Sequence, residues 1–128
     1  MEKILYIALG GSLGAVSRYA VTVAVQRFLT SFAPWGTLMV NASGCLIIGF
    51  LFCFVEEKII TPNMRFFIFT GFLGGYTTFS SYGLETFNLF RDGEFFTGTM
   101  NILLSNVLGI GFVFAGFFLG RALLNAIR

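Results

Sequence analysis

Four long apolar stretches take up most of this 128-residue chain and constrain its fold more than any other feature. They cover about residues 4–28, 37–55, 66–90 and 95–124. A helix needs roughly 20 apolar residues to cross the hydrocarbon core of a bilayer, so each stretch is long enough to span a membrane. The sequence therefore predicts an all-α membrane protein in which residues 1–128 form a single four-span domain.

The segments between the stretches are short, which leaves little chain for a catalytic domain outside the membrane. The chain has no histidine, so it lacks the commonest metal ligand and the usual proton shuttle at neutral pH. A net charge of +2 from scattered basic residues predicts no nucleic-acid partner. Cys45 and Cys53 are expected to be packing residues rather than a disulfide or metal pair. We expect a protein that works inside the bilayer and is not an enzyme.

The distribution of basic residues gives only a weak prediction of orientation. An even number of spans places both termini and the 56–65 connection on one side of the membrane. That side carries five Lys or Arg residues against two or three on the other, a small bias for the positive-inside rule. Both a single orientation with cytoplasmic termini and insertion in two orientations stay open. The residues counted are Lys3, Lys58, Arg65, Arg121 and Arg128 against Arg27, Arg91 and, by its reach, Arg18.

The third stretch contains a segment, residues 71–83, that does not suit an unbroken helix facing lipid. It holds four glycines and four Ser or Thr residues, together with the rings of Phe79 and Tyr82 three positions apart. Glycine permits non-helical backbone, and Ser and Thr side chains compete for backbone hydrogen bonds. We therefore predict a helix interruption from about Gly74 to Ser80. Such a break is stable in a membrane only where protein or a polar path surrounds it.

Two other stretches carry neutral polar residues on one helical face. Asn41 lies in the second stretch, and Asn101 and Ser105 occur in the fourth within a four-residue repeat that Thr97 begins and Gly109 ends. Such residues face protein or water rather than lipid. They form either hydrogen bonds between helices or the wall of a narrow polar path. The interruption in the third stretch favours the path.

Arg18 and Glu85 are the two charged residues that lie more than three positions from the end of a stretch. Arg18 stays ionised, so it needs a partner, water or a route to the interface. It either extends to the membrane surface or forms a positive charge at the mouth of an aqueous vestibule. For Glu85 we favour an ion pair with Arg27, Arg91 or Arg18, or an interface position, over a role as a proton carrier. Neutral donors, ring edges and one arginine, without rings of acidic residues, favour an anion as the solute.

Three segments together resemble the Fluc (CrcB) family of fluoride channels. They are Gly-Gly-Tyr-Thr-Thr-Phe-Ser-Ser-Tyr at 74–82, Gly-Ser-Leu-Gly-Ala-Val-Ser-Arg-Tyr at 11–19 and Gly-Thr-Leu-Met-Val-Asn-Ala-Ser-Gly at 36–44. The similarity extends over all four stretches in order and length. The family usually has a second phenylalanine where this chain has Tyr82.

The resemblance implies an antiparallel homodimer in the inner (plasma) membrane, with its two subunits inserted in opposite orientations. Two fluoride pathways would follow the subunit interface and mediate passive fluoride export. A structural sodium ion at the dimer centre would be held by backbone carbonyls of Gly74 and Thr77, and the vestibule arginine would be Arg18. The fluoride pathway would include Asn41, Thr78, Phe79, Ser80, Tyr82, Asn101 and Ser105.

Two other functions remain as alternatives. A small proton-coupled multidrug antiporter also has four spans, but it relies on a carboxylate in its first span, where this chain has Arg18. Glu85 is the only residue of this chain that could replace that carboxylate. In a non-transporting assembly subunit, the polar faces would serve only as contacts between helices.

Overall fold

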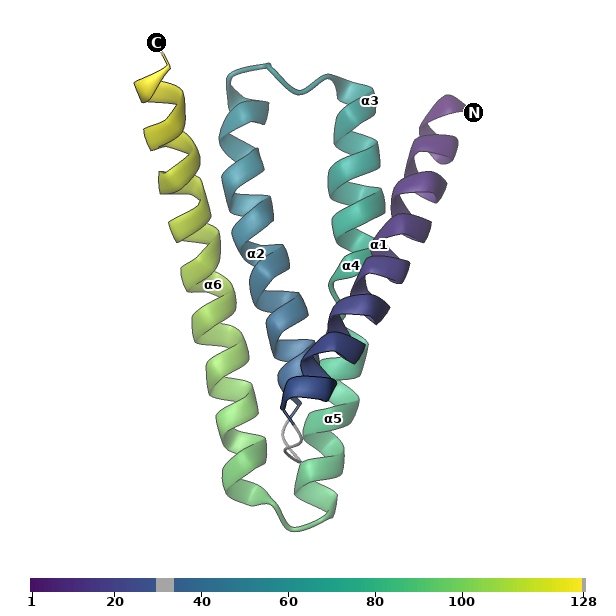
Figure 1. Cartoon of the computed structure of the whole chain (residues 1–128), viewed down its shortest axis with the longest axis vertical. Helices are drawn as coiled ribbons and strands as arrows, with labels where there is room; N and C mark the ends of the chain where they lie inside the picture. The colour runs from purple at the N-terminus through teal and green to yellow at the C-terminus, as the bar shows by residue number, and fades with distance from the viewer. Residues whose placement is uncertain (30–33, 128) are drawn as a thin grey trace.

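The computed structural model of this chain describes residues 1–29 and 34–127. These residues form helices and connections without any strand, which confirms the all-α prediction. Both termini lie at the same end of the molecule as the connection between α2 and α3 (Figure 1). The elements are α1 (Glu2–Phe28), α2 (Trp35–Glu56), α3 (Pro62–Arg65), the π-helix η1 (Phe66–Leu73), α4 (Gly74–Tyr76), α5 (Phe79–Arg91) and α6 (Phe95–Ala126).

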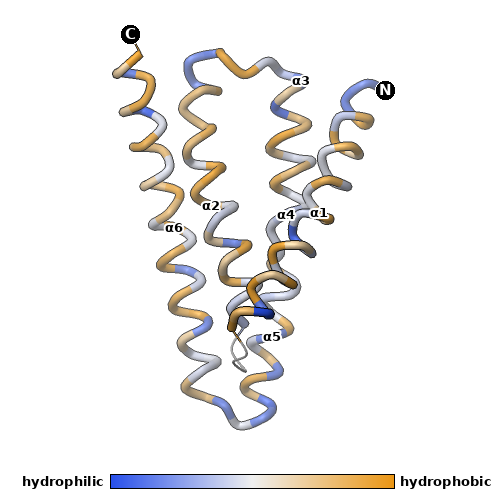
Figure 2. Tube along the Cα trace, viewed as in Figure 1, coloured by the Kyte–Doolittle hydropathy of each residue, from blue (hydrophilic) through white to orange (hydrophobic). Residues whose placement is uncertain are grey.

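Three of the described helices, α1, α2 and α6, are long and apolar enough to cross a membrane. The remaining apolar stretch forms the series α3, η1, α4 and α5 and is divided by a break. Polar residues concentrate toward the two ends of the molecule, whereas the middle of the helices is mostly apolar (Figure 2). This arrangement is that of a multi-pass membrane protein.

Glycines let the helices pack in two close pairs. Helix α2 packs along α6, and α1 packs along η1 and α4. A Cβ at Gly14 of α1 would overlap the carbonyl oxygen of Phe72, and one at Gly116 of α6 would overlap that of Leu46. Small residues at such contacts allow backbones to approach within van der Waals distance, which is the main source of helix association in lipid.

Substituting one of these glycines tests the packing. Gly14→Ala is expected to lower the stability of the folded protein by about 1–3 kcal/mol, because a backbone atom cannot move aside as a flexible side chain can. The midpoint of thermal unfolding in detergent measures the effect. Gly111→Ala is the matched control, since a Cβ there would meet no heavy atom within 4 Å. Equal midpoints for the two variants would contradict the close contact between α1 and η1.

The helix interruption lies where the hydroxyl residues are and not where the glycines are. Thr77 and Thr78 are extended, with ψ angles of 156° and 114°. Gly74, however, keeps helical angles, and α5 already begins at Phe79. The predicted interruption from Gly74 to Ser80 was therefore too long. A Cβ at Gly75 would lie 2.5 Å from the Gly11 carbonyl oxygen, so this glycine permits contact with α1 rather than a departure from the helix.

Candidate functional site

The side chain of Asn41 forms hydrogen bonds with both backbone polar groups of Thr78, a residue of the break. Its Nδ2 donates to the carbonyl oxygen of Thr78 at 3.0 Å, and its Oδ1 accepts from the Thr78 amide at 2.8 Å. Thr78 in turn caps α5, because its Oγ1 accepts from the Ser81 amide at 3.2 Å. The amide and carbonyl of Thr78 and the amide of Ser81 thus find side-chain partners, as polar groups at a break in hydrocarbon require. We call the paired contacts of Asn41 and Thr78 the Asn41 clasp.

These contacts divert two amides from the carbonyls that they would bind in a continuous helix. The Thr78 amide would donate to Gly74 and the Ser81 amide to Thr77, four residues earlier in each case. Both amides bind side-chain oxygens instead, Asn41 Oδ1 and Thr78 Oγ1. The carbonyl oxygens of Gly74 and Thr77 are thereby left available to another partner.

A groove of about 380 Å³ opens beside the clasp, between α2, the broken segment and α6. The rings of Phe79 and Tyr82 lie together in it, with their centroids 5.4 Å apart and their planes inclined by 58°. Phe79 is strongly exposed, at 82% of its surface. Neutral amide and hydroxyl groups, ring edges and backbone carbonyls therefore meet in one hollow. The lining includes Asn41, Cys45, Phe69, Gly74, Thr77, Thr78, Phe79, Tyr82, Ser105, Asn106 and Gly109.

The groove brings together most of the residues that the sequence nominated. Asn41, Thr78, Phe79, Tyr82 and Ser105 line it, as do the proposed sodium residues Gly74 and Thr77. Ser80 does not line it, although its Oγ lies 3.3 Å from the Thr78 Oγ1.

Asn101 is also absent from the groove. It is buried between helices, and its Nδ2 donates to Thr86 Oγ1 at 2.8 Å. Asn106, one helical position past Ser105, takes its place and donates to Tyr82 Oη at 3.4 Å. Sequence analysis did not nominate Asn106 because it falls outside the four-residue repeat. The available signal was its position next to Ser105.

Arg18 lies apart from the groove on α1. It is half-buried and makes no hydrogen bond or ion pair with a residue in the ranges 1–29 and 34–127. Arg18 follows Gly14 by one turn on the same helix face, on the side of α1 that packs toward the break. Its role in a vestibule stays a prediction.

Glu85 lies beside a different cavity, of about 390 Å³, between the ends of α1 and α2 and helix α5. Its Oε1 accepts from Thr37 Oγ1 at 2.6 Å, and its Oε2 is buried without a hydrogen-bond partner among the described residues. The ion pair expected with Arg27, Arg91 or Arg18 is not formed, and Arg91 binds Asp92 at 2.9 Å instead. A hydroxyl of the neighbouring helix, not a cation, is therefore the partner of this carboxylate.

A sequence profile of the family described as CrcB-like protein, Camphor Resistance (CrcB) matches residues 5–117. The chain belongs to this family. Similar CrcB-type proteins, each named "Fluoride-specific ion channel FluC", occur in Desulforapulum autotrophicum, with 45% identity over 94% of this chain and 97% of the relative, and in Salinibacter ruber, with 47% identity over 91% and 87%. The protein of that name from Parabacteroides distasonis is 39% identical over the full length of both chains.

These comparisons confirm the resemblance found in the three sequence segments. They also confirm that the relatives form a family of channels rather than of enzymes. Within the described residues, no three His, Cys, Asp or Glu side chains gather where they could hold a metal ion. A metal in this fold would therefore need backbone or neutral oxygen ligands.

Proposed function

We propose that this protein is a fluoride-selective channel that mediates passive fluoride export. The observation that carries the proposal is the groove at the Asn41 clasp, where neutral donors and ring edges meet beside a broken helix and no lining residue is acidic. The names of the relatives support fluoride as the ion. Hydrogen fluoride crosses a membrane as a neutral molecule and releases its proton in a less acidic cytoplasm, so a pore that passes the ion lets it leave.

Selectivity would come from replacing the hydration shell of a small anion in a narrow path. A pore conducts when binding is favourable enough to admit the ion and weak enough to release it. Amide and hydroxyl donors would come from Asn41 on α2 and from Ser105 and Asn106 on α6. The rings of Phe79 and Tyr82, which also line the groove, would offer the positive rims of their quadrupoles.

We propose that the working unit is an antiparallel homodimer with two such pathways. Phe79 and Asn106 are exposed on the single chain although they lie on apolar helices. Asn106 Nδ2 donates to Tyr82 and Ile102, but hydrocarbon would offer its Oδ1 no donor, which favours protein over lipid as the cover of this face. A second copy inserted in the opposite orientation would bring the two breaks together, and the weak charge bias permits both orientations.

A structural sodium ion fits the carbonyls that the break releases. The carbonyls of Gly74 and Thr77 lose their helical donors, and both residues line the groove. Carbonyl oxygens are suitable ligands for a hard cation, and two from each subunit would supply oxygen ligands to one ion. Such an ion would add fixed positive charge at the dimer centre.

Fluoride release from liposomes tests the function directly. Purified protein in vesicles loaded with fluoride is expected to release it when a potassium ionophore balances the charge, and a fluoride electrode follows the rate. Vesicles loaded with chloride are the control and are expected to retain their anion. Equal release of both halides would contradict selectivity, and no release at all would favour the assembly-subunit alternative.

The buried, unpartnered oxygen of Glu85 is the one feature that favours a proton-coupled antiporter. Glu85→Gln distinguishes the two functions, because the amide oxygen still accepts from Thr37 while the group can no longer carry a proton. We expect this variant to retain fluoride release, and neither it nor the wild type to move protons in exchange. Proton exchange in the wild type that Glu85→Gln abolishes would support the antiporter instead.

A further inference from the structure

A second hollow lies beside the groove, between α2 and η1. This hollow has a volume of about 320 Å³ and is lined by Phe52, Val55, Pro62, Arg65, Phe66, Phe69 and Thr70. Phe69 lines both hollows. Pro62 and Arg65 belong to α3, which lies at the end of the molecule that carries the termini (Figure 1). We call the two hollows together the α2–η1 valley; one lies toward this end of the protein and the other beside the Asn41 clasp.

The outer part of the valley contains one cation and no described acid. Arg65 is exposed and makes no side-chain hydrogen bond or ion pair with any residue that the structure describes. None of the described residues that line either hollow carries a carboxylate. A hollow of a single charge sign with low-dielectric walls focuses the electric field and raises the local concentration of the opposite ion.

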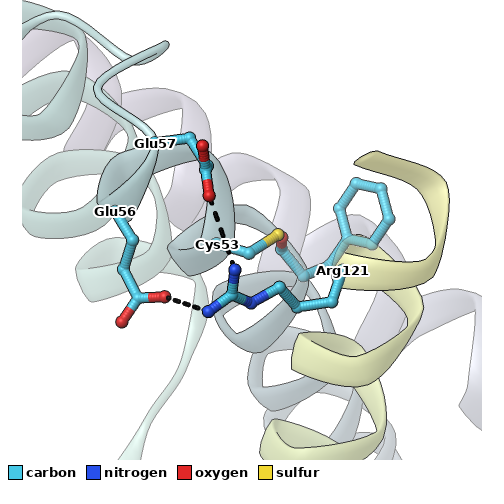
Figure 3. A network of polar contacts seen from close by, with 5 residues as sticks. Cys53, Glu56, Glu57 and Arg121 are labelled. Carbon is cyan, nitrogen blue, oxygen red and sulfur yellow. Dashed lines mark hydrogen bonds and ion pairs between the residues drawn. The ribbon is translucent and has the colours of Figure 1, made fainter. Parts of the chain in front are cut away.

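The two glutamates nearest to the valley in sequence are held by another helix. Glu56 and Glu57 end α2, and Arg121 of α6 binds them at 3.6 Å and 3.4 Å (Figure 3). The Arg121 guanidinium also lies over the ring of Phe117, 5.4 Å from its centroid. Helix α6 packs on the opposite side of α2 from the outer hollow, which none of its described residues lines (Figure 1). The contacts with Arg121 therefore hold both carboxylates toward α6 and offset part of their charge.

We propose that the outer valley is the anion entrance of the fluoride pathway, with Arg65 as the residue that collects fluoride. Arg121 is a positioning residue that keeps Glu56 and Glu57 away from this entrance. The inference rests on the proposed function and adds to it the route by which the ion reaches the clasp. The ion pairs of Arg121 are partly exposed and contribute little to stability, so their effect is on the electric potential of the entrance.

Removing the charge of Arg65 at two salt concentrations tests the entrance. Fluoride efflux is measured at fluoride levels far below saturation, in vesicles of neutral lipid, with an impermeant organic salt. One unit charge within several ångström of the ion route changes the local anion concentration by roughly threefold in water. Arg65→Gln is expected to slow efflux by this factor in about 10 mM salt and hardly at all in about 1 M, where the Debye length falls from about 30 Å to about 3 Å. Lys58→Gln, in the same connection but outside the valley, is the matched control and should change the rate less.

Changes at the α6 contact test the positioning role. Arg121→Gln is expected to slow efflux in low salt because the charge of Arg121 no longer offsets Glu56 and Glu57, and adding Glu56→Gln and Glu57→Gln to it should restore the rate. The double variant Glu56→Gln/Glu57→Gln with Arg121 intact should exceed the wild-type rate in low salt. Each rate is divided by the same variant's rate in about 1 M salt, where fixed charges are screened. This ratio removes differences in the amount of folded protein.

Three outcomes overturn the inference. An equal loss in low and high salt for Arg65→Gln would assign Arg65 a structural role. A loss that appears only when acidic lipid is added would identify a lipid headgroup, not fluoride, as its partner. A low-salt rate for Glu56→Gln/Glu57→Gln at or below that of the wild type would exclude the positioning role. Failure of the proposed function is distinguishable, because the wild type would then release no fluoride at either salt concentration.

Discussion

Phe79→Ile is expected to reduce fluoride efflux by about a hundredfold while leaving the fold intact. The phenyl ring is 82% exposed in the groove, so few contacts within the chain depend on it. Isoleucine fills similar space but has no positive ring edge to offer an anion. Losing an interaction of about 2–3 kcal/mol with a charged group raises the barrier enough for a decrease of roughly 30- to 150-fold.

The experiment compares three variants by initial efflux from proteoliposomes with a fluoride electrode. Phe87→Ile is the matched control, because Phe87 lies on the same helix, is also exposed, and does not line the groove. Tyr82→Phe keeps the ring and removes only the hydroxyl, so it should retain measurable efflux. An unchanged rate in Phe79→Ile would contradict a pathway along the groove. In that case, the polar residues that line the groove would serve only as contacts between helices.

The broad architecture could be predicted well from the sequence because the lipid bilayer determines it. A bilayer requires long apolar helices whose backbone groups are satisfied internally, so the lengths of the apolar stretches predict α1, α2 and α6 directly. The prediction of a break in the third stretch succeeded for a similar reason. Four hydroxyl residues close together in an apolar segment compete with the helix for its backbone hydrogen bonds, and two of them, Thr77 and Thr78, form the break.

The position of the break could not be predicted as well, because a glycine has two uses. The same residue type permits a departure from the helix and a close approach of another helix. Gly75 serves the second purpose, and this depends on Gly11, some 64 residues earlier, lying against it. Only the packing of α1 on α4 distinguishes the two uses, and no local pattern contains that information.

The rotation of α6 about its own axis could not be predicted from the sequence either. Asn101 and Ser105 are four residues apart and share a face, yet the structure turns Asn101 toward Thr86 and places Asn106 in the groove with Ser105. A helix that is apolar on nearly all sides has no solvent-facing stripe to define its orientation. The glycines of α6 that contact α2 define it instead, through the carbonyls of Leu46 and Phe50.

Asn41→Leu is expected to lower the stability of the protein by about 1–3 kcal/mol and to abolish efflux. Leucine has nearly the same size, but it leaves the Thr78 amide without its partner at the break. It also removes one donor from the Thr78 carbonyl, which as the N-cap carbonyl of α5 still accepts the first bond of that helix. An unsatisfied buried group costs about 1–3 kcal/mol, and water is absent from the hydrocarbon to compensate.

The fluorescence of Trp35, the only tryptophan, follows thermal unfolding of this variant in detergent. Asn106→Leu is the matched control: it makes the same chemical change in the opposite wall of the groove, where the amide contacts only Tyr82 Oη and the carbonyl of Ile102 on its own helix. Because neither partner is a backbone group of the break, this control should unfold near the wild-type midpoint. If Asn41→Leu unfolded there too, the break would be stable without the clasp. The Gly74 carbonyl would then be released without the Asn41 contact, and the proposed sodium site would no longer depend on α2.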